Sequence, residues 1–373
     1  MRNSTRKTVK SVCKCARQAV FAVFLTLIPS VALPFSFQPL LPPVLSTFVF
    51  STVPGNGDLN PYGVAFVPSG FPRGKLSPGD ILVSNFNNSG NLQGMGTSIV
   101  RVQLSPQPMF QQTSTFATTG KVTGLTAALG VIKQGFVFVG SVPTTDGTSA
   151  TVSAGPLLVL DSSGDVVDTI MSPPLNGPWG LAVNSRQANH VQIFVSNVLG
   201  GTVSRLDFSF PSAGAIRLDG ITQIGSRYSH RTDPAAIVIG PAGLAYDQDS
   251  DTLFVAGEAD NKIFAIAKAS TTTDQGTGKI VFADTSHLHG PMGLTLAPNG
   301  NLVVANNDSI NSDPNQPSEL LEFTTLGGFV RQFSIDPNID GPFGIAAAEF
   351  NQANDLTFLN DNNNTMSVWR FAE

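Results

Sequence analysis

Two histidines have the clearest chemical spacing in the sequence. His287 and His289 are separated by one residue and stand directly before Gly290-Pro291. In an extended chain alternate side chains face the same way, so both imidazoles can reach one metal ion or one substrate. A zinc site needs at least a third protein ligand. The spacing supplies none, so ordinary loop histidines are the alternative interpretation.

Familiar catalytic and metal-binding signatures are absent from the sequence. It contains no Gly-x-Ser-x-Gly elbow, no phosphate-binding P-loop and no His-Glu-x-x-His. The segment Asp247–Asp251 resembles the opening of a calcium loop, but Thr252 stands where that loop requires glycine. We therefore interpret it as a hairpin turn.

The N-terminal segment predicts export. Residues 1–17 carry six basic and no acidic side chains, an apolar run follows from Ala19 to Ile28, and Ser30-Val31-Ala32 offers a cleavage site. These features are typical of a cleavable signal peptide at residues 1–32. We expect a secreted or periplasmic protein whose residues 33–46 form a proline-rich tether. The apolar run is too short to span a bilayer comfortably, and an uncleaved N-terminal anchor is the alternative interpretation. No other segment approaches 18 continuous apolar residues, so the mature chain is expected to lack a transmembrane segment.

Charge and composition narrow the class of protein further. The whole chain has a net charge of −5, with 21 basic and 26 acidic side chains. Removal of residues 1–32 takes away six positive charges, which leaves about −11 and excludes nucleic acid as a partner. Both cysteines, Cys13 and Cys15, also leave with this segment, so no disulfide is expected. The acids are 21 Asp and 5 Glu alongside 25 Asn, a composition that favours turns over helices.

One short sequence motif, here called the phrase, recurs along the chain and divides the residues after the N-terminal segment into repeats. The phrase is Pro-x-Gly-apolar-Ala/Thr, and its copies begin at Pro61, Val122 (with the proline lost), Pro178, Pro241, Pro291 and Pro342. Their central glycines are 50 to 63 residues apart. In the fifth repeat, short apolar runs separated by turn residues predict four strands, at residues 293–297, 301–305, 318–323 and 329–334. A four-stranded antiparallel sheet repeated six times predicts an all-β, six-bladed β-propeller.

The last repeat lacks a fourth strand, and the N-terminal end can supply it. Thr47–Val53 is strand-like and has no partner before the first copy of the phrase. We predict that it pairs beside Met366–Phe371 and closes the ring, so that residues 47–373 form a single domain. The recurring glycine has a physical reason, because innermost strands converge on a narrow axis where a side chain would prevent close approach.

The repeats also resemble a known family. The phrase Gly-Pro-x-Gly-Leu-Ala, strands ending Val-Ala-Asn-Asn or Val-Ser-Asn, and a following strand such as Asn261–Ala265 resemble the NHL-repeat six-bladed propellers. The resemblance covers about residues 47–371. The wider superfamily includes gluconolactonase and senescence-marker-like proteins, virginiamycin-lyase-like proteins and peptidyl-amidoglycolate lyases. The resemblance implies a site at the top of the central channel, built around a metal or a histidine cluster.

The residues that would enter the channel here depart from the enzymes of that superfamily. They occupy the x position of the phrase and are mostly apolar: Tyr62, Thr123, Trp179, Ala242, Met292 and Phe343. No copy carries the histidine expected of the zinc lyases at this position, and no first-blade glutamate matches the lactonase-like metal ligands.

Two hypotheses follow, and the sequence does not decide between them. The first is a monomeric, non-catalytic binding scaffold for a small polar ligand, a glycan or a protein, with these candidate contacts: Tyr62, Trp179, Met292, Phe343, Asn306, Asp308 and Asp361. The second is a metal-assisted hydrolase or lyase that holds Ca²⁺ or Zn²⁺ through His287, His289 and Asp340, with Asp308 or Asp361 beside them.

Loops and strand ends add detail to the first hypothesis. Three long polar loops, at residues 86–96, 141–155 and 307–317, are natural places for ligand contacts. Asparagine closes the second strand of four repeats, at Asn85, Asn197, Asn306 and Asn360. Because the same residue recurs in several blades, we interpret it chiefly as a cap that bonds the backbone.

Overall fold

The computed structural model describes residue 40 and residues 46–104, 112–120, 124–212, 214–307, 310–350 and 353–371. The chain divides into two units, Met1–Ser36 and Phe37–Glu373, and every described residue belongs to the second. The predicted signal peptide therefore lies outside the described residues. Within those ranges, no helix is long and apolar enough to cross a membrane.

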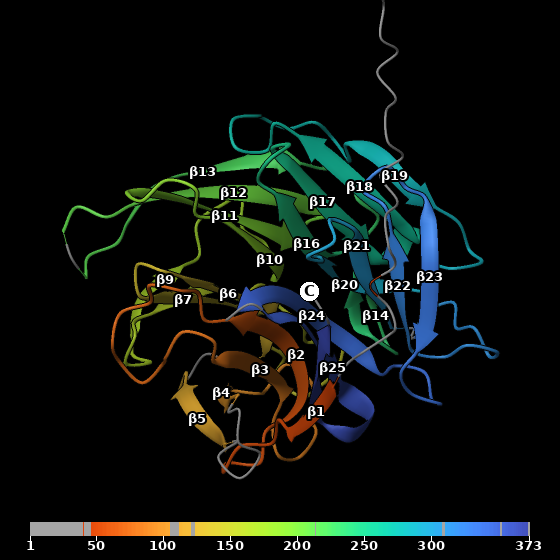
Figure 1. Cartoon of the computed structure of the whole chain (residues 1–373), viewed down its shortest axis with the longest axis horizontal. Helices are drawn as coiled ribbons and strands as arrows, with labels where there is room; N and C mark the ends of the chain where they lie inside the picture. The colour runs from red at the N-terminus through yellow and green to blue at the C-terminus, as the bar shows by residue number, and fades with distance from the viewer. Residues whose placement is uncertain are drawn as a thin grey trace, which may run out of the picture. The chain divides into compact units, whose positions relative to one another are not determined.

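Six four-stranded antiparallel sheets form a ring (Figure 1), which confirms the predicted propeller. Blade 1 contains β2 (Leu59–Phe66), β3 (Ile81–Asn87), β4 (Ser98–Gln103) and β5 (Gln112–Thr118). Blade 2 contains β6 (Leu125–Ile132), β7 (Phe136–Ser141), β8 (Leu157–Leu160) and β9 (Val166–Ile170). Blade 3 contains β10 (Pro178–Asn184), β11 (His190–Asn197), β12 (Thr202–Ser209) and β13 (Arg217–Gly225).

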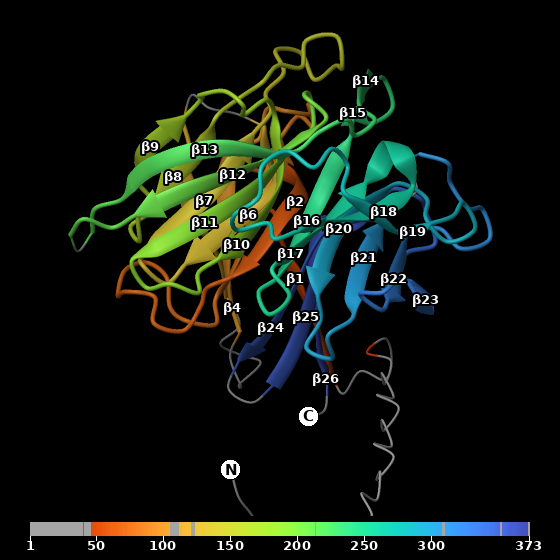
Figure 2. The same cartoon turned by 90° about the horizontal axis from the view of Figure 1, so that it is seen from above.

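The second half of the ring repeats this order and adds one hairpin. Blade 4 contains β16 (Pro241–Asp247), β17 (Thr252–Gly257), β18 (Lys262–Ala267) and β19 (Lys279–Ala283). Blade 5 contains β20 (Pro291–Leu296), β21 (Leu302–Asn306), β22 (Glu319–Phe323) and β23 (Phe329–Ser334). Blade 6 contains β24 (Pro342–Phe350), β25 (Ala353–Asn360), β26 (Thr365–Phe371) and β1 (Ser46–Ser51). The hairpin of β14 (Arg231–Asp233) and β15 (Ile237–Ile239) lies on one face of the ring (Figure 2).

The N-terminal strand closes the ring as predicted. β1 pairs antiparallel with β26, with Thr47 opposite Trp369 and Phe50 opposite Met366. The predicted tether also makes a contact with the ring. The backbone N–H of Leu40 lies 2.9 Å from both carboxylate oxygens of Glu322, and its side chain is buried in the core between blades 5 and 6. At this one residue the segment is therefore part of the packed domain.

The central glycines stand where neighbouring innermost strands touch. A Cβ on Gly180 would lie 2.1 Å from the carbonyl oxygen of Ala242 in the next blade, far inside contact distance. The same clash would arise between Gly293 and the carbonyl of Phe343, at 2.2 Å. A hydroxyl bridges the first seam: Ser196 Oγ accepts from the Gly180 N–H at 2.8 Å and donates to the Ala242 carbonyl at 2.7 Å. The close approach expected from the sequence is thus confirmed.

The second copy of the phrase is displaced from the predicted position. Gly124 corresponds to the glycine that precedes the proline, because its carbonyl accepts from Val142 N–H as that of Gly177 accepts from Val198 N–H. The central position belongs to Ala128 instead. A Cβ on Gly140, opposite it in β7, would lie 2.8 Å from the Ala128 Cβ, so the small residue has moved to the partner strand. The predicted x residue of this copy, Thr123, lies outside the described residues.

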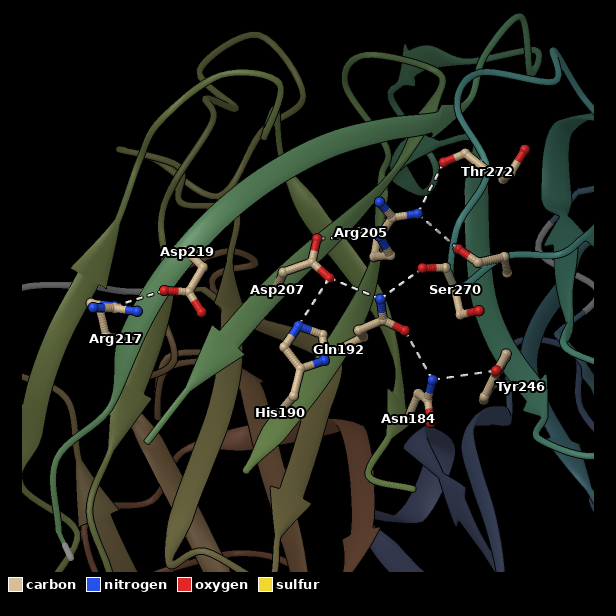
Figure 3. Close-up of polar contacts among 11 residues, drawn as sticks. Asn184, His190, Gln192, Arg205, Asp207, Arg217, Asp219, Tyr246, Ser270 and Thr272 are labelled. Atoms are coloured by element: carbon tan, nitrogen blue, oxygen red, sulfur yellow. Dashed lines mark hydrogen bonds and ion pairs between the residues drawn. The ribbon is translucent and has the colours of Figure 1, made fainter. Parts of the chain in front are cut away.

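Polar side chains fasten blade 3 to blade 4 (Figure 3). Gln192 Nε2 donates to Asp207 Oδ1 and to the Ser270 carbonyl, both at 2.8 Å. Arg205 Nη1 donates to the carbonyl oxygens of Ala269 and Thr272 at 3.1 and 2.9 Å, and Arg205 Nε lies 3.2 Å from Asp207 Oδ2. These bonds hold the loop after β18 against β11 and β12, so we assign the cluster a structural role.

We expect Gly180→Ala to destabilise the protein by about 3 kcal/mol, because the new methyl group would press against a backbone carbonyl that cannot move without separating two blades. Urea unfolding followed by circular dichroism measures the change. Gly220→Ala in β13 is the matched control, since nothing lies within 4 Å of its Cβ position. Equal stabilities of the two variants would contradict the assignment.

Candidate functional site

An apolar cluster fills the centre of the ring. It contains Tyr62, Phe86, Trp179, Met292 and Phe343, all buried. Tyr62 stacks between Phe86 and Phe343 with ring centroids 4.5 and 4.1 Å away, and Trp179 meets Tyr62 edge-on at 5.6 Å. The centre of the propeller is therefore packed.

A cavity of about 330 Å³ lies against this cluster. Its floor includes Tyr62, Met292 and Phe343. Ala235 and Ala236, from the turn of the β14–β15 hairpin, also line it. The polar side chains around it are Asn60, Asn87, Asn91, Gln93, Asp340, Asp361, Asn362 and Asn364. The cavity thus combines an apolar floor with amide and carboxyl groups, and no basic side chain is among its described lining residues.

One backbone position, directly after the second strand, is repeated in blades 2 to 6. In blades 2 to 6 its N–H donates to the carbonyl of the glycine before the innermost strand, from Val142, Val198, Glu258, Asn307 and Asp361. The shared bond gives these residues the same register. Val142 and Val198 lie in the central apolar cluster, and Asp361 lines the cavity. At this repeated position the side chain is therefore apolar in blades 2 and 3 and polar in blades 4 to 6.

Asp361 is a carboxyl of the cavity with a strongly raised pKa. Burial raises its pKa, and the charge of Asp340 raises it further, to about 8. With its nitrogen toward this carboxyl, the Asn60 amide donates to both oxygens, at 2.6 and 3.0 Å. Asn60 and Asp340 both have positive φ, 61° and 71°, a conformation that non-glycine residues rarely adopt. Such strain is retained where the surroundings hold a residue in place, and it concentrates at functional sites.

Glu258 is a third acidic residue within electrostatic range of Asp340 and Tyr62. It begins the 3-10 turn Glu258–Asp260 and is fully buried. Neither of its carboxylate oxygens has a hydrogen-bond partner within the described ranges. Burial raises the pKa of Glu258 well above its ordinary value, and the charges of Asp340 and Asp233 add to this effect. Burial likewise raises the pKa of Tyr62, helped by Asp361, Asp340 and Glu258, so the three acids share one electrostatic environment.

The predicted ligand contacts fall into different places. Tyr62, Met292, Phe343 and Asp361 line the cavity. Trp179 is not among the lining residues; it lies in the apolar cluster, where its Nε1–H points at Met292 Sδ, 3.4 Å away. Asp308 lies outside the described residues.

Asn306 is used within its own blade. Its Oδ1 accepts from the His289 N–H at 2.8 Å, and its Nδ2 donates to the His287 carbonyl at 3.1 Å and to Glu319 at 2.9 Å. It is fully buried and does not line the cavity. This geometry agrees with the interpretation of the recurring asparagine as a backbone cap.

The expected grouping of His287, His289 and Asp340 does not form. His287 Nδ1 lies 2.7 Å from Asp284 Oδ2, and its ring packs against Phe329. The Nδ1 of buried His289 faces the Asn311 carbonyl. Only Asp340 lines the cavity. In the part of the chain that the structure describes, no group of three or more His, Cys, Asp or Glu side chains could hold a metal ion. The spacing placed both histidines on one loop, but local partners turn their rings elsewhere.

The sequence does not indicate most of the polar side chains that line the cavity. We call this set the polar wall; it consists of Asn60, Asn87, Asn91, Gln93, Asp340, Asp361, Asn362 and Asn364. Asn87, Asn91 and Gln93 belong to the first long loop. The sequence predicts ligand contacts for this loop but does not indicate which of its residues make them. Asn60 directly precedes the first copy of the phrase, and Glu258 directly follows a residue that closes a second strand. Aligning these flanking positions across all repeats would have revealed Glu258 and Asp361 together.

Comparison with known proteins supports the fold. No model of a known protein family matches the chain, and no curated protein does. Among solved structures, a gluconolactonase from Xanthomonas campestris is similar, with 11% identity, a TM-score of 0.52, and 88% of this chain and 91% of that chain covered. A calcium-binding protein, regucalcin from Agrobacterium tumefaciens, has 12% identity and a TM-score of 0.49 over 85% and 92% of the two chains. A chain of the nidogen/laminin complex has 11% identity and a TM-score of 0.48 over 77% and 84%.

These findings define the class of protein. The chain is a six-bladed β-propeller that shares its architecture with a gluconolactonase. At this level of identity the likeness concerns the fold alone, and membership of the NHL-repeat family stays a prediction.

We expect the stability of the protein to fall as pH rises. A carboxyl whose pKa is raised in the folded state binds more protons there than in the unfolded chain. For Asp361 the resulting stabilisation of the folded state is complete below about pH 4 and is lost as the pH rises toward about 8. Asp361→Asn should therefore raise the melting temperature relative to the wild type by about 2–5 °C at pH 9, and by less at pH 5.

Thermal unfolding at pH 5, 7 and 9 measures this difference. Glu258→Gln should change stability with the same sign, because burial acts on it in the same way. Asp168→Asn, on the exposed strand β9, controls for the loss of one negative charge. Parallel pH profiles for Asp361→Asn and the wild type would contradict the assignment.

Proposed function

We propose that the protein is an exported β-propeller that binds a small polar ligand in the cavity beside its central cluster. The observation that carries the proposal is the cavity itself, whose apolar floor and convergent amide and carboxyl groups are typical of small-molecule sites. Its volume equals that of about ten water molecules, which suits a compact ligand.

The polar wall is held in position by its own hydrogen bonds. Asn364 Oδ1 accepts from the Asn60 N–H at 2.7 Å, and Asn87 Nδ2 donates to Asn91 Oδ1 at 2.8 Å. Asn362 Nδ2 donates to the Ile339 carbonyl at 3.0 Å. Side chains fixed in this way lose little conformational entropy when a ligand binds, so the wall is suited to recognition.

A cavity-filling variant tests ligand binding. We expect isothermal titration with a panel of monosaccharides, small amines, small carboxylates and Ca²⁺ to find at least one ligand. Ala235→Trp, in the hairpin turn that lines the cavity, should weaken its binding at least tenfold. Ala188→Trp is the control, because Ala188 is exposed and lines a different cavity between blades 2 and 3. A ligand that binds both variants equally well would place the site elsewhere and defeat the proposal.

Export is tested separately. The basic segment, apolar run and small residues of the first 32 positions support it. We expect protein recovered from the periplasm or the medium to begin at residue 33, as read by N-terminal sequencing. Retention of full-length protein in the cytoplasm would show that this segment does not direct export.

A metal-assisted hydrolase or lyase is the second candidate. Asp340, Asp361 and the amide oxygens of the wall form an oxygen-only donor set, which fits Ca²⁺ better than Zn²⁺. A calcium ion held there would polarise a substrate carbonyl and would favour the ionised forms of Asp340 and Asp361. Metal analysis of the purified protein separates the candidates. Equimolar calcium that is lost in Asp340→Asn but kept in a His287→Ala/His289→Ala double variant would favour the second.

A further inference from the structure

The cavity contains an acceptor that lacks a donor. Asn87 lines it and is 2% exposed, yet its Oδ1 has no hydrogen-bond partner in the described parts of the chain. Its Nδ2 donates to Asn91 Oδ1, which fixes the orientation of the amide. A buried carbonyl oxygen without a donor costs free energy, so the site is complementary to a ligand that donates a hydrogen bond.

The second unpartnered group, Glu258, is also an acceptor. Its backbone register after β17 is that of Val142, Val198 and Asp361, although Glu258 itself does not line the cavity. Both of its oxygens lack donors. Among the described side chains that line the cavity, the buried atom without a partner is Asn87 Oδ1, which an N–H group of a ligand would satisfy.

The electrostatic environment points to a positive charge. Asp340 and Asp361 line the cavity, and no lysine, arginine or histidine is among its described lining residues. Glu258 is not a lining residue, and its electrostatic neighbours include Arg231 as well as Asp340. Burying like charges together is unfavourable unless a counter-charge joins them. The apolar floor of Tyr62, Met292 and Phe343 offers the complementary surface for a hydrocarbon skeleton.

We propose that the ligand is a compact protonated amine, whose ammonium group is held by Asp340, Asp361 and the Oδ1 of Asn87 while its carbon skeleton rests on the apolar floor. The inference rests on the proposed function and specifies its ligand class. An ammonium group has three donors and one positive charge, which matches the acceptors and acids of this wall.

Matched pairs of small molecules test the inference. Isothermal titration at pH 8 would compare methylammonium, cyclohexylammonium and 1,4-diaminobutane with methanol, cyclohexanol and 1,4-butanediol. We expect at least one amine to bind at least tenfold more tightly than its alcohol. Ala235→Trp should abolish this binding, and Asp361→Asn should weaken the amine at least tenfold without affecting the alcohol.

Two further variants guard against trivial explanations. Asp168→Asn, on the exposed outer strand β9, should leave the amine affinity unchanged. Asn87→Asp adds a negative charge at the unpartnered acceptor and should tighten amine binding, provided that its circular dichroism matches the wild type. An amine affinity that follows net charge equally in all variants would overturn the inference.

The remaining outcomes separate the inference from the proposed function. Equal binding of an amine and its alcohol, blocked by Ala235→Trp, would overturn the amine class while leaving a polar-ligand site intact. Binding of Ca²⁺ or a monosaccharide at this site, with no amine binding below 10 mM, would do the same. If no compound of either panel binds, both the amine inference and the proposed ligand-binding function are overturned.

Discussion

Backbone contact between neighbouring innermost strands is the constraint on which the propeller depends. At Gly180 and Gly293 the next blade's carbonyl occupies the space that a side chain would need. Where a hydroxyl is available, as at Ser196, it bridges the two strands directly. The ring can close at this radius only if each blade keeps a small residue at the contact, and blade 2 does so by moving the glycine to Gly140 in the partner strand.

The same packing determines where chemistry can occur. Because the strands converge so closely, large side chains at the x positions fill the centre. Polar groups line the cavity from the ends of second strands, from the first long loop and from the starts of innermost strands. After the second strands the blades differ: Val142 and Val198 extend the apolar cluster, whereas Glu258 and Asp361 begin 3-10 turns and present carboxyl groups. A repeated backbone position thus carries unequal side chains in different blades, and in blade 6 it contributes Asp361 to the cavity. The repeated blades fix the backbone geometry, and residues that differ between equivalent positions of the blades form the polar part of the cavity.

Much of the fold could be predicted from the sequence, and less of the site. The recurring phrase fixed the number of blades, and the unpaired segment before it predicted the pairing of β1 with β26. The second copy was misplaced because Gly124 and the true central residue, Ala128, cannot be told apart without the hydrogen bond from Val142. The histidines were overvalued because spacing along a loop does not reveal that Asp284 and Asn311 engage their rings. The polar wall is assembled from blade 1 and from blade 6 with the loop before it, and contacts between residues so distant in sequence leave no local pattern.

The pairing of β1 with β26 joins positions as far apart as Ser46 and Arg370. A ribosome must therefore release nearly the whole chain before the last blade can acquire its fourth strand, and until then both edges of the open sheet array stay exposed. For a protein proposed to leave the cytoplasm, this delay is useful. If the protein is exported as proposed, a polypeptide that has not completed its ring would still be unfolded enough for translocation, and the final strand pairing would follow passage through the membrane.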